Sequence, residues 1–138
     1  MNTIATNTHH ARGVLAETAA DSVTVSFPGT NYRLRLRVYQ PPTTPVGKRI
    51  IGSIRVQAKR VDNVHTGGRY VEPLEGSPRR VQGEVITNDV GDNTLVINAG
   101  IPIFCKLTDP RQNAGQFKAG DLISCEVAPG ASFAPALG

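Results

Sequence analysis

The chain has 138 residues, of which 39% are hydrophobic, with no Trp, four Phe and three Tyr. Domains commonly run about 100 to 150 residues, so this length predicts one small domain or two very small ones packed together. Charged residues make up 19% and the formal net charge is +4, which excludes a histone-like polycation and an acidic disordered tail. The 14 Gly and 10 Pro favour many short elements joined by turns.

Residues 1–10 are rich in Thr and Asn and show no periodicity, so we expect a loose N-terminal segment. This segment lacks the apolar run of about 7 to 15 residues that a secretory signal needs. No stretch of the chain reaches the roughly 18 consecutive apolar residues of a membrane span. The two cysteines, Cys105 and Cys125, are too few for a disulfide framework. These features predict a cytoplasmic protein that does not enter a membrane.

From Arg12 onward, apolar and polar residues alternate with a period of two, which is typical of half-buried strands. The alternation is strictest in 22–27 and 32–38, where Val and Leu fall on one face and Ser, Thr or Arg on the other. No window of a dozen residues carries a helical stripe, so the sequence predicts an all-β protein. Further strands are expected at 13–17, 50–61, 81–87, 94–99, 103–108 and 122–127.

Similar features recur in the same order in the two halves of the chain, which predicts an internal duplication. The matched pairs are 12–15 with 82–85, 23–25 with 95–97, 34–38 with 103–107, Gly47 with Gly120, 54–56 with 125–127, and 68–73 with 130–135. We therefore expect a basic unit at 11–75 and a near-neutral unit at 76–138, each of about four strands. Because one such unit buries little of its surface, the expected fold is an antiparallel barrel shared by both units or a pair of packed small barrels.

The second unit contains G-x-V at 83–85, a turn with Asp92, L-V-I at 95–97, and F-K-A-G-D-L-I at 117–123. This order resembles strands one to four of small OB-like β-barrels, including uncharacterised bacterial modules of that type. The G-x-V and G-D elements are interpreted as markers of turn geometry. The first unit departs from the pattern, with Gly47-Lys48-Arg49 where the second has Gly120-Asp121. The resemblance implies a barrel and names no function, since such modules bind nucleic acids, sugars, metals or proteins.

Few residues in the sequence carry catalytic or metal-binding chemistry. Cys105 and Cys125 fall in inward phase, which favours buried packing, with a disulfide between neighbouring strands as the alternative. His9, His10 and His65 have no thiolate or carboxylate at ligand spacing, so no metal or cofactor is expected. The segment 88–93 lacks the ligands of a calcium loop and favours a hairpin turn. Nucleophile, zinc, P-loop and dinucleotide motifs are missing from the sequence, so we do not expect an enzyme.

A ladder of arginines distinguishes the first unit. Alternate residues of the strand at 32–38 are arginines and lie about 6.8 Å apart on its outward face. If 32–39 and 48–61 pair as a hairpin, seven cations share one face: Arg33, Arg35, Arg37, Lys48, Arg49, Arg55 and Lys59. Like charges that face each other repel, so the cluster needs a carboxylate, a second subunit or a phosphate-bearing polymer as counter-charge. A solvated face that protects a sheet edge is the simpler alternative.

These observations leave two hypotheses of function. The first is a non-catalytic module that forms a homo-oligomer or binds a protein partner, with Phe104, Phe117 and Phe133 of the second unit as contact surface. The second is binding of nucleic acid or another polyanion through the seven cations. Residues 1–75 hold ten Lys and Arg and five Asp and Glu, giving +5, whereas 76–138 hold five and six, giving −1. A polyanion is therefore expected to meet the first unit.

Overall fold

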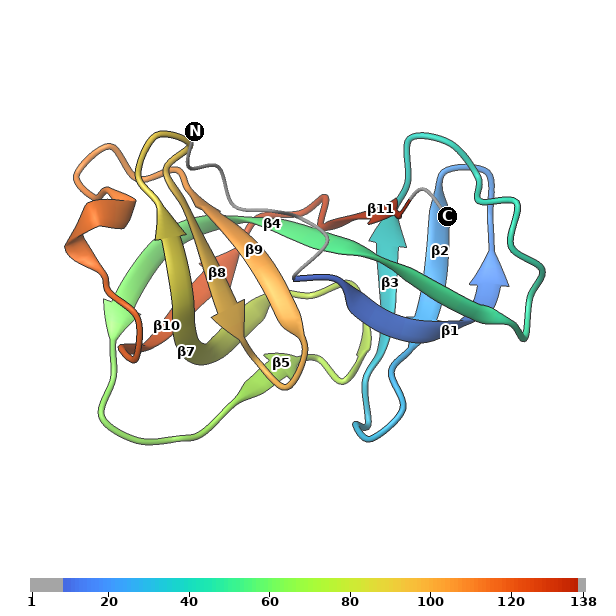
Figure 1. Ribbon diagram of the computed structural model, residues 1–138, viewed down its shortest axis with the longest axis horizontal. Coiled ribbons are helices and arrows are strands. Elements are labelled where there is room, and N and C mark those ends of the chain that lie inside the picture. The colour runs from blue at the N-terminus through green and yellow to red at the C-terminus, as the bar shows by residue number, and fades with distance from the viewer. Residues whose placement is uncertain (1–8, 137–138) are drawn as a thin grey trace.

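The computed structural model describes residues 9–136 and is all-β over that range, as expected (Figure 1). Its strands form one mixed sheet, and a short 3-10 turn, η2 (Ala114–Gln116), follows the ninth strand. Of the N-terminal segment expected to be loose, residues 1–8 lie outside the described range. The strands are β1 (Ala11–Thr18), β2 (Ser22–Ser26), β3 (Arg33–Arg37), β4 (Arg49–Asn63), β5 (Tyr70–Glu72), β6 (Glu75–Gly76), β7 (Arg80–Asp89), β8 (Thr94–Asn98), β9 (Pro102–Leu107), β10 (Leu122–Val127) and β11 (Ser132–Pro135).

The alternation in the sequence places the strands and their buried faces correctly. All eight expected strands are confirmed to within two residues at each end, whereas β5, β6 and β11 are additional. In β3 the two leucines are buried and the three arginines are exposed. The hairpin turn expected at 88–93 is also confirmed, because β7 and β8 pair on either side of it. Its left-handed residue is Asn93, with φ of 54°.

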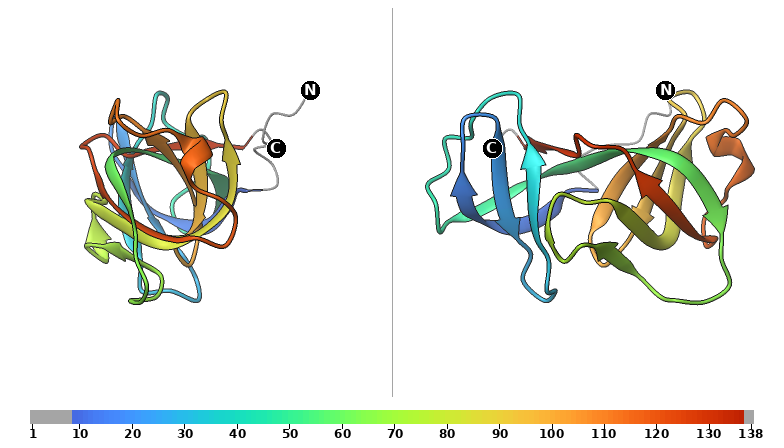
Figure 2. Two further views of the ribbon diagram at one scale, coloured as in Figure 1. Left: turned by 90° about the vertical axis from the view of Figure 1, so that its left-hand side faces the viewer. Right: turned by 180° about the vertical axis from the view of Figure 1, so that it is seen from behind.

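The strand pairings form two closed circuits that share β4. The first runs β1, β2, β3, β11, β4 and back to β1, and the second runs β4, β10, β7, β8, β9 and back to β4. The first half of β4 pairs with β1 and β11, and its second half pairs with β9 and β10. Figures 1 and 2 show the result as two lobes side by side, with β4 running through both.

The hairpin expected between 32–39 and 48–61 is wrong, because β11 lies between β3 and β4. Ser132 pairs in parallel with Arg37 of β3, and Phe133 pairs antiparallel with Ile54 of β4. The cause is the aromatic side chain of β11, which is 1% exposed and belongs to the hydrophobic core. A Cβ atom at Gly52 would lie 2.6 Å from Cζ of Phe133, so the absence of a side chain there makes room for the ring.

The two circuits repeat the same local irregularities. The ladder between β1 and β2 shifts register between Leu15 and Glu17, and the ladder between β7 and β8 shifts between Val85 and Thr87. Backbone hydrogen bonds at these sites also correspond. The amide of Gly47, whose φ is +91°, donates to the carbonyl of Leu15 at 2.7 Å. In the second circuit the amide of Gly120 donates to Val85 at 2.9 Å, with φ of +95°.

The glycines of the two G-x-V elements lie inside β1 and β7, so their interpretation as turn markers is wrong. A Cβ atom at Gly13 would collide with Cγ1 of Val25, and one at Gly83 would collide with the backbone carbonyl of Asn98. Each glycine therefore permits the close approach of the neighbouring strand, β2 or β8.

A buried tyrosine hydroxyl links the two lobes. The hydroxyl of Tyr32 donates to the carbonyl of Ala99 at 2.7 Å and so joins the first lobe to the second. Burial raises the pKa of this phenol.

The expected packing of the cysteines is confirmed: both are buried and free. A hydrogen bond with the Cys125 thiol, together with burial, raises the pKa of the Cys105 thiol.

Candidate anion-binding groove

A row of outward-facing side chains crosses four neighbouring strands at the middle of the molecule. Ser132 of β11 faces Arg37 of β3 on one side and Arg55 of β4 on the other. Arg55 in turn faces Phe104 of β9. Paired residues on neighbouring strands point to the same face of a sheet, and strands lie about 4.8 Å apart. The backbones of Arg37 and Arg55 are therefore roughly 10 Å apart, with β11 between them.

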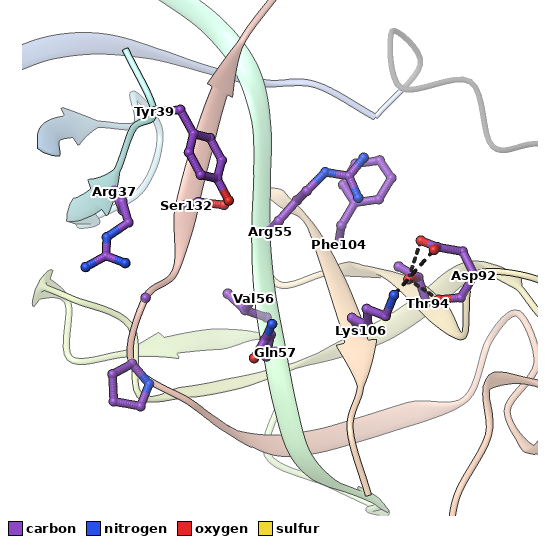
Figure 3. A pocket seen from close by; sticks show the side chains of 12 residues that line it. Arg37, Tyr39, Arg55, Val56, Gln57, Asp92, Thr94, Phe104, Lys106 and Ser132 are labelled. Carbon is purple, nitrogen blue, oxygen red and sulfur yellow. Dashed lines mark hydrogen bonds and ion pairs between the residues drawn. The ribbon is translucent and has the colours of Figure 1, made fainter. Parts of the chain in front are cut away.

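This row borders a hollow of about 330 Å³, whose cations are Arg37, Arg55 and Lys106 (Figure 3). A second hollow of about 290 Å³ is lined by Arg35 and Arg37 and shares Arg37 and Gly130 with the first. We call the two hollows together the basic groove. Its four cations come from β3, β4 and β9, and thus from both circuits.

Carboxylates leave most of this charge uncompensated. Nζ of Lys106 lies 3.5 Å from Oδ1 of Asp92. A hydrogen bond from Thr94, together with the charges of Lys106 and Arg55, lowers the pKa of Asp92. Among residues 9–136, no carboxylate lies within ion-pair distance of Arg35, Arg37 or Arg55. Asp21, which borders the second hollow, forms no ion pair with any cation in the described range either.

Phe104 supports the guanidinium of Arg55 from below. Cζ of Arg55 lies 4.5 Å from the ring centroid, at the distance of a cation–π interaction. The ring of His9 packs edge-on against Phe104, with centroids 6.1 Å apart and an interplanar angle of 73°. Figure 3 shows the Arg55 side chain turned toward the ring of Phe104. The contact favours a position of the exposed guanidinium at the border of the groove.

Tyr39 adds an exposed aromatic ring to the groove. It follows β3 at two residues from Arg37, so it continues the outward phase of the arginine ladder, and it lines the first hollow. Its side chain is 91% exposed, more than any other large hydrophobic residue of the described chain. Tyrosine rings are usually packed or half-buried, so packing does not explain this position.

Three of the seven cations expected on one face, Arg35, Arg37 and Arg55, lie in the groove. Arg33 instead forms an ion pair with Glu17 at 3.1 Å, in which both side chains are largely exposed.

The remaining three cations are distributed elsewhere. Lys48 and Arg49 stand at the start of β4, where Arg49 pairs with Val14 of β1. Lys59 lines a separate hollow of about 580 Å³ with Arg79 and Arg80.

Lys106 was not among the sequence candidates. The alignment of 34–38 with 103–107 pairs Arg37 with Lys106, and that correspondence is the signal that could have found it.

The aromatic contact surface expected on the second unit is wrong. Phe104, Phe117 and Phe133 are 3%, 4% and 1% exposed, so they cannot meet a partner. Phe117 and Phe133 belong to the hydrophobic core, and Phe104 lies under Arg55. Aromatic residues in a chain with so few of them are needed to fill the interior.

Other kinds of site find little support within residues 9–136. No group of three or more His, Cys, Asp or Glu side chains converges there, and no helix in that range is long and apolar enough to cross a membrane. Comparison with protein families, curated proteins and solved structures finds no match to this chain. The guanidinium groups of the groove are suited to phosphate and other oxyanions.

Proposed function

We propose that this protein is a non-catalytic module that binds a polyanion in the basic groove. The observation that carries the proposal is the proximity of Arg35, Arg37 and Arg55, none of which has a carboxylate partner within the described chain. The Debye length is about 8 Å at physiological salt, so the charges of Arg37 and Arg55, roughly 10 Å apart at the backbone, are largely screened from each other. A chain of phosphates or sulfates would gain charge-assisted hydrogen bonds from both.

We further propose that the two closed circuits are two small β-barrels that arose by duplication. The matched bulges, the matched glycine hydrogen bonds and the close-approach glycines of β1 and β7 support this proposal. On these correspondences Ile50 matches Ile123, since each pairs with the glycine of its G-x-V element. The match of Ile54 is then Val127, two residues beyond its match in the sequence alignment.

In this interpretation the two units exchange their fifth strands. The third strand of the first unit, β3, has β11 as its parallel neighbour, and the third strand of the second unit, β9, has the second half of β4. Each of these fifth strands is also antiparallel to the fourth strand of the unit that it completes. Thus β11 comes from the second half of the sequence and closes the first circuit, while β4 closes the second.

The exchange explains why both units contribute to the groove. Arg37 and Lys106 are the last outward residues of the two third strands, and both line the first hollow. Gly130, which precedes β11, and Ser132, its first residue, complete the border of the hollow. A polyanion in the groove would therefore contact both units and not the first unit alone.

The proposal is tested by titrating fluorescein-labelled polyphosphate and a fluorescein-labelled 12-nucleotide oligomer with the full chain at several salt concentrations. The groove variant is Arg37→Ala/Arg55→Ala. The matched control is Lys48→Ala/Arg49→Ala, which removes the same charge from the start of β4. We expect wild type and control to bind with a steep salt dependence and the groove variant to bind at least 10-fold more weakly. A plot of the logarithm of its binding constant against the logarithm of salt concentration should have a negative slope that is smaller in magnitude by roughly 1.5, since two phosphate contacts are lost.

Equal weakening by the two double variants would show that net charge, and not the groove, drives binding. If neither probe binds at 50 mM salt, the proposal is overturned altogether. Thermal unfolding of each variant checks that all remain folded. Light scattering on the same samples measures the stoichiometry of the complex and whether the chain forms the homo-oligomer that the sequence predicts.

A further inference from the structure

The basic groove combines its cations with an aromatic ring that a simple anion would not need. Tyr39 is 91% exposed and lines the first hollow together with Arg37 and Arg55. An exposed aromatic ring gains stability only when something flat or apolar covers it. Phosphate and sulfate groups do neither, so the ring points to a ligand that carries both anions and flat groups.

A second flat surface borders the same hollow. The guanidinium of Arg55 lies over the ring of Phe104, 4.5 Å from its centroid, and Phe104 is 3% exposed. A guanidinium held against an aromatic ring on one side leaves its other side as a stacking surface, and nucleobases stack on such arginine planes as well as on tyrosine. Figure 3 shows Tyr39 and Arg55 on neighbouring parts of the hollow.

We propose that the groove binds single-stranded nucleic acid, with phosphates held by its arginines and one base stacked on Tyr39. The inference rests on the proposed polyanion-binding function and specifies its ligand. Arg35 and Arg37 lie about 6.8 Å apart along β3, a step comparable to the separation of successive phosphates in an extended single strand. Tyr39 follows two residues beyond the end of β3.

The geometry favours a single strand over the other polyanions. In a duplex the bases stack on each other inside the helix, so no base face is free to meet Tyr39. A hollow of about 330 Å³ is at the lower end of the range of ligand pockets, roughly 300 to 1,000 Å³, and a duplex is too wide to enter it. Polyphosphate carries no flat or apolar group that could cover the ring.

The test compares two 12-mers of equal charge, oligo-dT and a fully abasic oligodeoxynucleotide, on wild type and on Tyr39 variants. Stacking of one base contributes about 1–3 kcal/mol, so wild type should bind oligo-dT roughly 5- to 150-fold more tightly. Tyr39→Leu should lose most of the preference for oligo-dT, while its affinity for the abasic oligomer should equal that of wild type. Tyr39→Phe keeps the ring and should keep the preference. Because Tyr39 is exposed, neither substitution should disturb folding.

A second measurement reports the contact directly. The chain has no Trp, so Tyr39→Trp introduces a single tryptophan whose fluorescence should be quenched by oligo-dT and not by the abasic oligomer. Equal affinity of wild type for the two oligomers would overturn base stacking, and an unchanged preference in Tyr39→Leu would overturn stacking on Tyr39. Either result leaves polyanion binding intact. Equal affinity for a 12-base-pair duplex would overturn the single-strand selectivity. Failure of every probe to bind would overturn the proposed function as well.

Discussion

Phe133→Ala tests whether β11 holds the first lobe closed. The side chain is 1% exposed within the core, on a strand of only four residues. Truncation of a buried Phe to Ala typically costs about 3–5 kcal/mol, depending on how far the surroundings collapse. Collapse is restricted here because Gly52, which faces the ring, is paired with Ala11 of β1 and with Pro135 of β11. We therefore expect a cost near the upper end, about 4–5 kcal/mol.

Urea unfolding followed by far-ultraviolet circular dichroism measures this loss, which is a large part of a total stability on the order of 10 kcal/mol. Hydrogen exchange adds a local reading, because the amide of Arg37 donates to the carbonyl of Ala131 at 2.8 Å and should lose protection. Ala134→Ser, an exposed position on the same strand, is the control and should change stability by less than about 0.5 kcal/mol. If the free energy of unfolding of Phe133→Ala lies within about 1 kcal/mol of the wild-type value, β11 does not anchor the lobe.

Two further substitutions probe the glycine inside β7 and the link between the lobes. Gly83→Ala places a methyl group against the backbone carbonyl of Asn98 and should destabilise the fold by about 3 kcal/mol or more; Gly91→Ala, in a roomy turn, should melt near the wild-type temperature. Burial raises the pKa of Tyr32, so its contribution to stability is complete below about pH 10 and is lost as the pH rises through the raised value. Tyr32→Phe should cost roughly 1 kcal/mol of stability at pH 7 and should reduce the loss of stability at alkaline pH. Urea midpoints measured from pH 8 to 11.5 check this, and an equal alkaline loss in wild type and variant would show that the phenol is not buried.

Period-two alternation was sufficient to predict the all-β class and most of the strands because each long strand has one buried face. In β3 every Leu is buried and every Arg exposed, so local pattern and tertiary burial agree. The same reasoning could not place β11, because its four residues contain one core side chain, Phe133, and no alternation to read. Pairing between residues 52–55 and 132–135 depends on the whole fold and leaves no local signal.

The failure to predict β11 accounts for most errors in the predicted site. A hairpin of 32–39 with 48–61 would have placed all seven cations on one face, but the insertion of β11 moves β3 away from β4. Arg37 and Arg55 remain on one surface because both pair with Ser132 of β11, which lies between them. Lys48 and Arg49 instead lie beside β1. Residue type and phase therefore identified the outward cations, whereas their grouping required the strand order.

The groove and the strand exchange that we propose depend on each other physically. If each unit kept its own fifth strand, the second half of β4 would have to turn back onto the first lobe, and Arg55 would no longer face Phe104 of β9. Because β4 instead continues into the second lobe, its middle carries Arg55 between β11 and β9, where Arg37 and Lys106 approach from the two sides. The same long strand that joins the lobes thus creates the surface on which their cations converge. A ligand seated there would contact both lobes and favour their present arrangement, since binding to the folded state alone stabilises it.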